Sequence, residues 1–378
     1  MITGVSTNVC AFVGRTQRGI ASRAIELRTF SDFELVFGGL RTDSPMTYGV
    51  YDFFAQGGER ALVVRVESEA GGPLSLDDYA RGFAVLEDER LVPDLNLLCV
   101  PPDARDGDTA PEVYGAAARL CRKRRAFLIV DPPRSWGEER DISQLTADDF
   151  GPDLGIEAAS REARFAAVYF PRVIAPDLRN SGIPTEVSTS GSIAGLYAST
   201  ATRQGVWKPP AGVRASLKGA AALATDLTDR DLRTLNAQGI NPLLSHHSVG
   251  RVVWGARTLA GAESGDPRDR YVSVRRLTNY IELSLAQGLR WTATAHNNPE
   301  LWTRVEEVVD VFMRDLRDRG AFINYAVYPC SSTTSEADRR NRIARLQLGF
   351  APTGPGEFHY VFIQLTTLQE PVPCSLTY

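Results

Sequence analysis

Two short apolar runs constrain the fold of this chain more than any other feature. LNLLCV occupies Leu95–Val100 and AFLIVD occupies Ala126–Asp131, and neither run alternates between apolar and polar positions. A strand that is apolar on both faces has to be covered on both faces, as in a parallel sheet between two layers of helices. The runs therefore predict an α/β domain. Its other expected strands are Cys10–Val13, Ala61–Val66 and Arg164–Phe170.

Helical patterns alternate with these strands, as an α/β domain requires. A short helix is expected to end at Phe37, with Ser31 or Asp32 as its N-cap and a Gly-Gly pair after its last residue. Residues 182–191 are expected to form a polar loop. The other helices expected in this part of the chain are Met46–Gln56, Pro111–Arg124 and one within Gly191–Gly212.

The polar segment Gly261–Asp269 interrupts the pattern, and it predicts an α/β domain at residues 1–265 and an α+β domain at residues 266–378. In the second domain, Asn298 is expected to cap a helix that has Pro299 at its first position and Gly320 after its end. Its expected apolar face is Leu301, Val305, Val308, Phe312 and Leu316. The other elements expected are a helix at Tyr271–Gln287 and strands at Phe322–Tyr328, Ile343–Phe350 and Phe358–Leu365.

The charge and cysteine content exclude some classes of function. The chain has 42 Lys and Arg against 46 Asp and Glu, a formal net charge of −4, which argues against nucleic-acid binding as the main activity. The five cysteines are widely spaced and form no CxxC pair. This pattern argues against a disulfide framework or a zinc site and favours a reducing compartment.

The sequence contains no apolar run near the roughly 20 residues that span a bilayer. The N-terminal residues MITGVSTNV lack the basic and apolar regions of a signal peptide. We therefore expect synthesis and folding in the cytoplasm, without insertion of the subunit into a membrane.

One motif resembles a phosphate-binding loop. Gly14 and Gly19 have the glycine spacing of that loop and follow an apolar strand. A phosphate loop continues with Lys and then Ser or Thr, which reach the phosphates and the magnesium ion. Ile20 and Ala21 occupy those places here. A plain turn is the better interpretation, and no cofactor is expected.

The histidines and carboxylates give no catalytic or metal-binding pattern. His246 and His247 are adjacent, and neighbours on an extended chain point to opposite faces. No HExxH motif or GxSxG elbow is present, and the histidines are expected to be polar surface residues. Sequence alone does not exclude a Ser-His-Asp triad, because geometry assembles such a site. We expect no catalytic residue and no metal site.

The order of several blocks resembles that of contractile tail sheath proteins. The stretch Ala11–Val66 is similar to the opening of these proteins, and the block GSIAGLYASTATRQGVWKPPAG has the family's order of glycines, Trp-Lys and Pro-Ala-Gly. The further similar blocks are Ile240–Gly261, Tyr271–Trp291 and Gly349–Leu365. The resemblance covers nearly the whole chain.

The resemblance implies a subtilisin-like three-layer α/β sheath domain followed by an α+β C-terminal sheath domain. It also implies a structural subunit, not an enzyme, that polymerises around an inner tube and contracts to drive the tube through a target envelope. Other copies of the chain, the inner tube protein, and the baseplate and cap proteins are the implied partners.

The resemblance implies assembly in the bacterial cytoplasm, as part of a phage tail or of a released phage-tail-like particle. It leaves open an origin in a phage, an R-type pyocin or an extracellular contractile injection system. Two alternatives remain: a specialised sheath ring at the baseplate or cap end, and a hydrolase on an α/β scaffold.

Sheath subunits are linked by terminal arms that add strands to a neighbour's sheet, so the resemblance implies intersubunit contacts near both ends of this chain. The arm expected at the C-terminal end is Thr366–Tyr378, in which Pro371 and Pro373 limit pairing. The family's N-terminal arm precedes a Gly-Val-Ser-Thr segment that begins here at Gly4, so either the true start lies upstream or this is a variant. The candidate contact residues are Ile2, Val5, Phe358, Tyr360, Phe362, Leu365 and Leu368.

Overall fold

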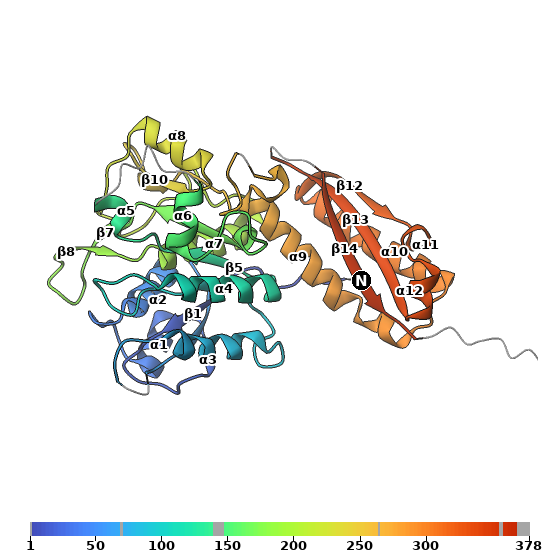
Figure 1. Ribbon diagram of the computed structural model, residues 1–378, viewed down its shortest axis with the longest axis horizontal. Helices are drawn as coiled ribbons and strands as arrows, with labels where there is room; N and C mark the ends of the chain where they lie inside the picture. The colour runs from blue at the N-terminus through green and yellow to red at the C-terminus, as the bar shows by residue number, and fades with distance from the viewer. Residues whose placement is uncertain (1, 69–70, 139–146, 264, 355–357, 369–378) are drawn as a thin grey trace, which may run out of the picture. The chain divides into compact units, whose positions relative to one another are not determined.

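The computed structural model describes residues 2–68, 71–138, 147–263, 265–354 and 358–368 (Figure 1). The chain forms two compact units, one of Ser6–Arg276 and one of Met1–Val5 with Leu277–Tyr378. The units divide between Arg276 and Leu277, inside helix α9 (Val272–Gly288). The boundary predicted from the sequence, between residues 265 and 266, lies before this helix. Within the described ranges, no helix combines the length and the apolar character needed to cross a lipid bilayer.

The larger unit is built on an eight-stranded sheet in the order β11-β10-β6-β5-β4-β1-β3-β2. The strands from β10 to β3 are parallel, and the edge strands β11 and β2 pair antiparallel with their neighbours. The sheet confirms the predicted α/β class. Its strands are β1 Val9–Gly14, β2 Ala24–Leu27, β3 Arg60–Arg65, β4 Leu97–Cys99, β5 Phe127–Val130, β6 Ala166–Phe170, β10 Asn241–His246 and β11 Gly250–Val253.

This sheet has an apolar core on each face, which explains the unbroken apolar runs in its strands. Along β1, Ala11 and Val13 point into one core, whereas Cys10 and Phe12 point into the other. Helices α3 and α4 cover the first core, and α2 and α7 cover the second (Figure 1). The helices of this unit are α1 Phe30–Phe37, α2 Pro45–Ala55, α3 Leu76–Glu87, α4 Pro111–Arg124, α5 Ser135–Glu138, α6 Ala147–Leu154, α7 Ser190–Gln204 and α8 Asp229–Ala237.

The N-cap of α1 differs from the prediction. Thr29 is the N-cap, and its side-chain oxygen accepts a hydrogen bond from the backbone N–H of Asp32 at 3.2 Å. The carboxylate of Asp32 accepts the backbone N–H of Thr29 at 2.9 Å in return. The helix begins at Phe30, so Ser31 and Asp32 already lie within its first turn. The prediction of Ser31 or Asp32 as the N-cap was therefore wrong.

The loop expected at residues 182–191 is also partly wrong, because it contains a strand. β8 (Pro184–Val187) pairs antiparallel with β7 (Val173–Pro176), which also pairs with β9 (Ala222–Leu223). The turn of this hairpin begins at Asp177. Burial alone would raise the pKa of Asp177, but hydrogen bonds from Arg105 and Tyr48 outweigh it and lower the pKa to about 2.

The smaller unit has a three-stranded antiparallel sheet, β12-β13-β14, with helices packed on one face. The ring of Tyr280 on α9 lies 6.2 Å from the ring of Phe312 on α10. Asn298 caps α10 and accepts the N–H of Leu301 at 2.9 Å, as predicted, but Val309 is buried where Val308 was expected. The elements are α10 Pro299–Asp318, β12 Phe322–Tyr328, α11 Cys330–Thr333, α12 Glu336–Arg340, β13 Ile343–Pro352 and β14 His359–Thr366.

Helices α2 and α7 approach each other closely because glycines lie at their contact. A Cβ atom on Gly191 would lie 2.2 Å from the carbonyl oxygen of Gly49 and 2.6 Å from its Cα. A Cβ atom on Gly195 would lie 2.5 Å from the carbonyl oxygen of Phe53. Side chains at these positions would separate the two helices, so the glycines set the distance between α2 and α7.

We predict that Gly191→Ala lowers the free energy of unfolding by about 1–3 kcal/mol, because the added methyl group meets backbone that cannot move independently. Urea unfolding followed by tryptophan fluorescence measures the change. Gly39→Ala is the matched control, since the nearest atom to its added Cβ is 3.7 Å away. Equal stabilities of the two variants would contradict the proposed close contact.

Candidate functional site

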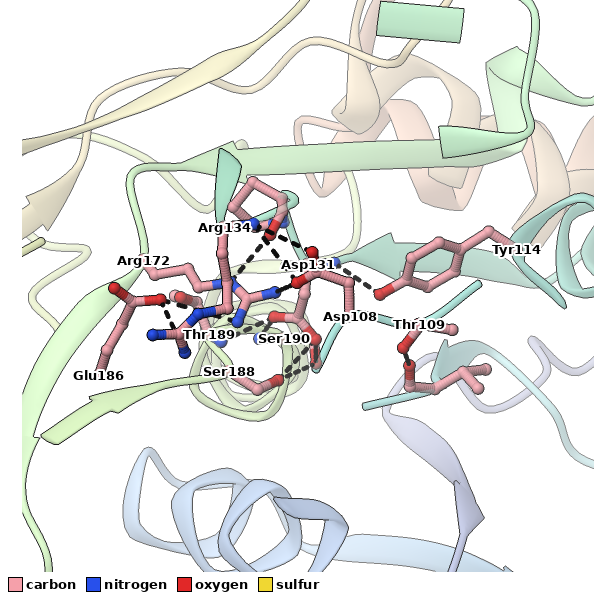
Figure 2. A network of polar contacts seen from close by, with 12 residues as sticks. Asp108, Thr109, Tyr114, Asp131, Arg134, Arg172, Glu186, Ser188, Thr189 and Ser190 are labelled. Atoms are coloured by element: carbon pink, nitrogen blue, oxygen red, sulfur yellow. Dashed lines mark hydrogen bonds and ion pairs between the residues drawn. The ribbon is translucent and has the colours of Figure 1, made fainter. Parts of the chain in front are cut away.

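A buried polar network lies at the carboxyl end of the central strand β5 (Figure 2). Asp131 follows directly after β5 and is 3% exposed. Its carboxylate faces the residues at which α7 begins, Ser188, Thr189 and Ser190 (Figure 2). In α/β sheets, the carboxyl ends of the strands are the usual place for a ligand site. The network is therefore a candidate functional site.

The carboxylate of Asp131 accepts four hydrogen bonds from the start of α7. One oxygen accepts the backbone N–H groups of Thr189 at 2.7 Å and Ser190 at 2.8 Å. The other accepts the hydroxyls of Ser188 at 2.5 Å and Ser190 at 2.7 Å. Thr189 occupies the N-cap position but makes no capping bond with its own side chain. Asp131 thus caps α7 from a neighbouring strand, and its negative charge is favourable at that end of the helix.

A second set of charges lies beside this cap (Figure 2). The guanidinium of Arg172, whose side chain is 5% exposed, donates to the carbonyl of Pro132 at 2.8 Å and to Asp108 at 2.5 Å. Glu186 on β8 lies 3.4 Å from Arg134 and 3.7 Å from Arg172. These pairs connect the loop after β5 to the β7–β8 hairpin. Their charges are compensated within the network.

The phenol of Tyr114 on α4 closes the network on its other side (Figure 2). Its oxygen accepts the backbone N–H of Asp131 at 3.2 Å. Burial raises the pKa of Tyr114 far above its usual value, so the phenol stays protonated at every physiological pH. Strand β5 is thereby tied to α4 on one face and to α7 on the other.

The arrangement supports a structural role better than catalysis. A nucleophilic serine needs a base that takes its proton, and histidine is the usual base. The described partners of the Ser190 hydroxyl are Asp131 and the hydroxyl of Ser188. No group of three or more His, Cys, Asp or Glu residues that could hold a metal ion occurs in the described ranges.

Two predictions about the histidines were wrong. The rings of His246 and His247 stack with centroids 4.5 Å apart instead of pointing to opposite faces. The reason is that β10 ends at His246, so the chain has left the extended conformation there. His359 was expected at the surface but is 8% exposed, with its ring stacked on Phe350 at 5.5 Å.

The loop with phosphate-loop glycine spacing leads to a strand. β1 ends at Gly14, and the next element is the edge strand β2. A phosphate loop leads into a helix whose N-terminus binds the anion. The loop after β1 lacks that helix.

The predicted contact residues occupy three different environments in the smaller unit. Ile2 is 6% and Leu365 5% exposed, whereas Tyr360, Phe362 and Leu368 are exposed. Val5 and Phe358 are half-buried. The rest of the proposed C-terminal arm, residues 369–378, lies outside the described residues.

Contacts within the smaller unit hold its N-terminal residues. The side chain of Ile2 lies against Gly288 of α9, where an added Cβ would be 2.8 Å from Ile2. The backbone N–H of Val5 donates to the hydroxyl of Ser284 at 3.1 Å.

Strand β14 lies at one edge of its sheet. It pairs with β13 through the register from Phe350 opposite His359 to Ile343 opposite Thr366. In the described part of the chain, its second edge is not paired with another strand. An edge strand offers backbone N–H and C=O groups to a further strand. This edge and the exposed aromatic residues on β14 are the candidate interaction surface.

Comparisons with known proteins match this chain to phage tail sheath proteins and to chains of phage-tail-like particles. The family model of the phage tail sheath protein central domain matches residues 75–259. The tail sheath protein of Vibrio phage KVP40 is 28% identical in an alignment of length 295 that covers 71% of this chain and 42% of that protein. The chain therefore spans less than half the length of this curated relative.

Two solved structures have the same fold. A chain of the anti-feeding prophage helical sheath in the contracted state aligns with a TM-score of 0.73 and 24% identity, over 95% of this chain and 94% of that one. A chain of the anti-feeding prophage baseplate aligns with the same TM-score and identity, over 98% of this chain and 95% of that one.

We predict that Asp131→Ala lowers the free energy of unfolding by at least about 3 kcal/mol, because two backbone N–H groups and two hydroxyls lose their acceptor at a buried site. Asp43→Ala is the control, since Asp43 and its ion-pair partner Arg41 are 61% and 40% exposed and the loss of the pair should cost at most about 1 kcal/mol. Urea unfolding of the two variants compares them. Similar losses would show that the Asp131 cap does not hold α7.

Proposed function

We propose that the chain is a member of the phage tail sheath protein family and the structural subunit of a contractile sheath. The observation that carries this proposal is the family match in the centre of the larger unit, residues 75–259. The similarity of fold to the anti-feeding prophage sheath chain covers 95% of this chain and also supports the proposal. The proposed partners are other copies of the chain, an inner tube protein, and the baseplate and cap proteins.

In this role the subunit is mechanical and not enzymatic. The sheath is assembled around the tube in an extended state and then changes to a shorter and wider packing of the same folded subunits. Such a transition needs two arrangements of the interfaces that differ in free energy. The energy is stored when the polymer forms, so contraction itself consumes no nucleotide.

We propose that the larger unit is the subtilisin-like three-layer domain of the family and the smaller unit its C-terminal sheath domain. The sheet of the larger unit, with an apolar core on each face, supports the first assignment. The α+β composition of the smaller unit supports the second. Assembly would take place in the bacterial cytoplasm, as part of a phage tail or phage-tail-like particle.

We propose that the contacts between subunits lie at the edge of β14 and around the N-terminal residues of the smaller unit. The exposed Tyr360, Phe362 and Leu368 can contact a neighbour directly. Ile2 and Leu365 are buried, so they would act by supporting the surface from inside. Val5 and Phe358 lie at the margin of that surface.

A specialised ring at the end of a sheath is the second candidate. The similarity to a chain of the anti-feeding prophage baseplate, which covers 98% of this chain, favours it. An end ring forms one layer and then stops, whereas a sheath subunit continues to add layers. The length of the assemblies distinguishes the two functions.

We predict that the purified chain assembles into tubes or stacked rings, because identical copies with an open strand edge can pair repeatedly. Negative-stain electron microscopy over a range of salt and protein concentrations detects the assemblies. Long tubes support the sheath subunit, and uniform single rings support the end ring. A protein that remains monomeric under all conditions contradicts both.

We also predict that replacing residues 369–378 with a Gly-Ser segment of equal length reduces assembly at least several-fold. The buried residues that the structure describes in both units all precede residue 369, so the urea midpoint should stay within the error of the unaltered chain. Sedimentation measures assembly, and circular dichroism measures the midpoint. Unchanged assembly would exclude this segment from the contacts.

A further inference from the structure

A fixed turn lies beside β11, one of the two edge strands of the eight-stranded sheet. The backbone N–H of Ala215 donates to the carbonyl of Gly212 at 2.8 Å, which closes the turn. The N–H of Gly212 donates to the carbonyl of Val253 on β11 at 2.7 Å, and the N–H of Val253 donates to the carbonyl of Ala215 at 3.0 Å. Val213 and Arg214 therefore occupy the corner of a turn that the sheet holds in place.

An exposed tryptophan follows β11 at the same point of the sheet. Trp254 is 42% and Val213 is 50% exposed. The backbone N–H of Trp254 donates to the carbonyl of Pro242 on β10 at 2.9 Å, so its position is fixed as well. Arg214 is exposed, and among the described residues its guanidinium has no ion-pair partner. Exposed tryptophan and arginine are the residues that most often anchor a protein interface. We call Val213, Arg214 and Trp254 the Trp254 knob.

A hollow of about 570 Å³ lies next to the other edge strand, β2. It is lined by residues 39–43, Gln17, Glu34 and Arg179. Gln17 belongs to the connection between β1 and β2, and Glu34 belongs to α1, which follows β2. Pockets of roughly 300–1,000 Å³ accept drug-sized molecules, which are larger than one indole ring. The hollow therefore has room for a tryptophan side chain. We call it the α1 hollow.

The hollow contains one free charge of each sign. Arg41 and Asp43 neutralise each other, with 2.5 Å between their charged atoms. Glu34 and Arg179 are exposed, and neither forms an ion pair within the described part of the chain. The backbone N–H of Arg179 donates to the carboxylate of Asp177 at 2.9 Å, which fixes the residue at the tip of its hairpin. An occupant should therefore supply a cation for Glu34 and an aromatic ring or an anion for Arg179.

We propose that the Trp254 knob of one copy binds in the α1 hollow of a second copy. Arg214 then pairs with Glu34, since opposite charges across an interface are favourable. The guanidinium of Arg179 lies on the indole face of Trp254, which attracts a cation. Each free charge of the hollow is thus matched by one group of the knob.

The order of the strands requires that the knob and the hollow come from different copies. They lie at opposite edges of the sheet, and Figure 1 shows β10 and α1 at opposite ends of the larger unit. Seven strand spacings of about 4.8 Å separate the edges by about 34 Å. A contact between unlike surfaces leaves each copy with a free knob and a free hollow, so it repeats until a ring closes or a helix forms.

This contact depends on side chains and not on the pairing of strands. The outer edge of β11 is covered, because the N–H of Leu217 donates to the carbonyl of Arg251 at 2.8 Å beside the two bonds of Val253. A further strand could not be added there. The inference rests on the proposed sheath function, and it adds a contact of the larger unit to the contacts proposed for the smaller unit.

Charge reversal in the full chain tests the proposal. Arg214→Glu and Glu34→Arg each place like charges in the contact, so each should reduce the sedimented polymer at least five-fold at low salt. A mixture of equal amounts of the two variants should restore assembly, because the introduced glutamate of one meets the introduced arginine of the other. The remaining contacts of that mixture join the native Arg214 and Glu34. Such restoration cannot come from misfolded chains.

Matched controls lie at exposed positions outside the knob and the hollow. Arg161→Glu and Glu59→Arg reverse charges that are exposed and have no ion-pair partner among the described residues, and both variants should assemble like the unaltered chain. Trp254→Ala should reduce the polymer at least five-fold, whereas Leu91→Ala, at a position that is 66% exposed, should not. A mixture of the two charge variants that stays unassembled overturns the proposal.

Electron microscopy of the same samples distinguishes failure of the contact from failure of the function. If Arg214→Glu and Glu34→Arg form the same tubes or rings as the unaltered chain, the contact is overturned and the sheath function stands. Restored single rings without long tubes would support the contact and favour the end ring. An unaltered chain that never assembles would overturn both.

Discussion

The hydrogen bonds to the carboxylate of Asp131 are the interaction on which the rest of the larger unit depends. They lie at the end of a strand that is buried on both faces, where water cannot supply missing partners. Helix α7 takes its N-terminal cap from this carboxylate, and α7 in turn positions α2 through the close contact at Gly191. Asp131 thus supports both helices, α7 through its cap and α2 through the contact of α2 with α7.

A rigid unit of this kind suits the proposed mechanical role. A sheath that contracts has to transmit force through each subunit, so the subunit must keep its packing while its contacts with neighbours change. Close-packed cores do not deform continuously, and changes therefore concentrate at interfaces. In the larger unit, the charges of Arg172, Asp108 and Glu186 are compensated inside the network. The surface of the smaller unit, by contrast, has exposed aromatic rings on β14, and among the described residues the outer edge of β14 pairs with no other strand.

Much of the fold could be predicted from local patterns, but the buried network could not. Helix Pro111–Arg124 and strand Phe322–Tyr328 have the predicted bounds. Pro111 marks the start of the helix locally, and Gly320 and Pro329 flank the strand. The role of Asp131 depends on two segments that are far apart in the sequence and meet only in the folded sheet. Its signals were an acidic residue after an apolar strand and the polar run STS before α7. The strand β8 was missed for the same reason, since pairing with β7 and not its own composition makes it a strand.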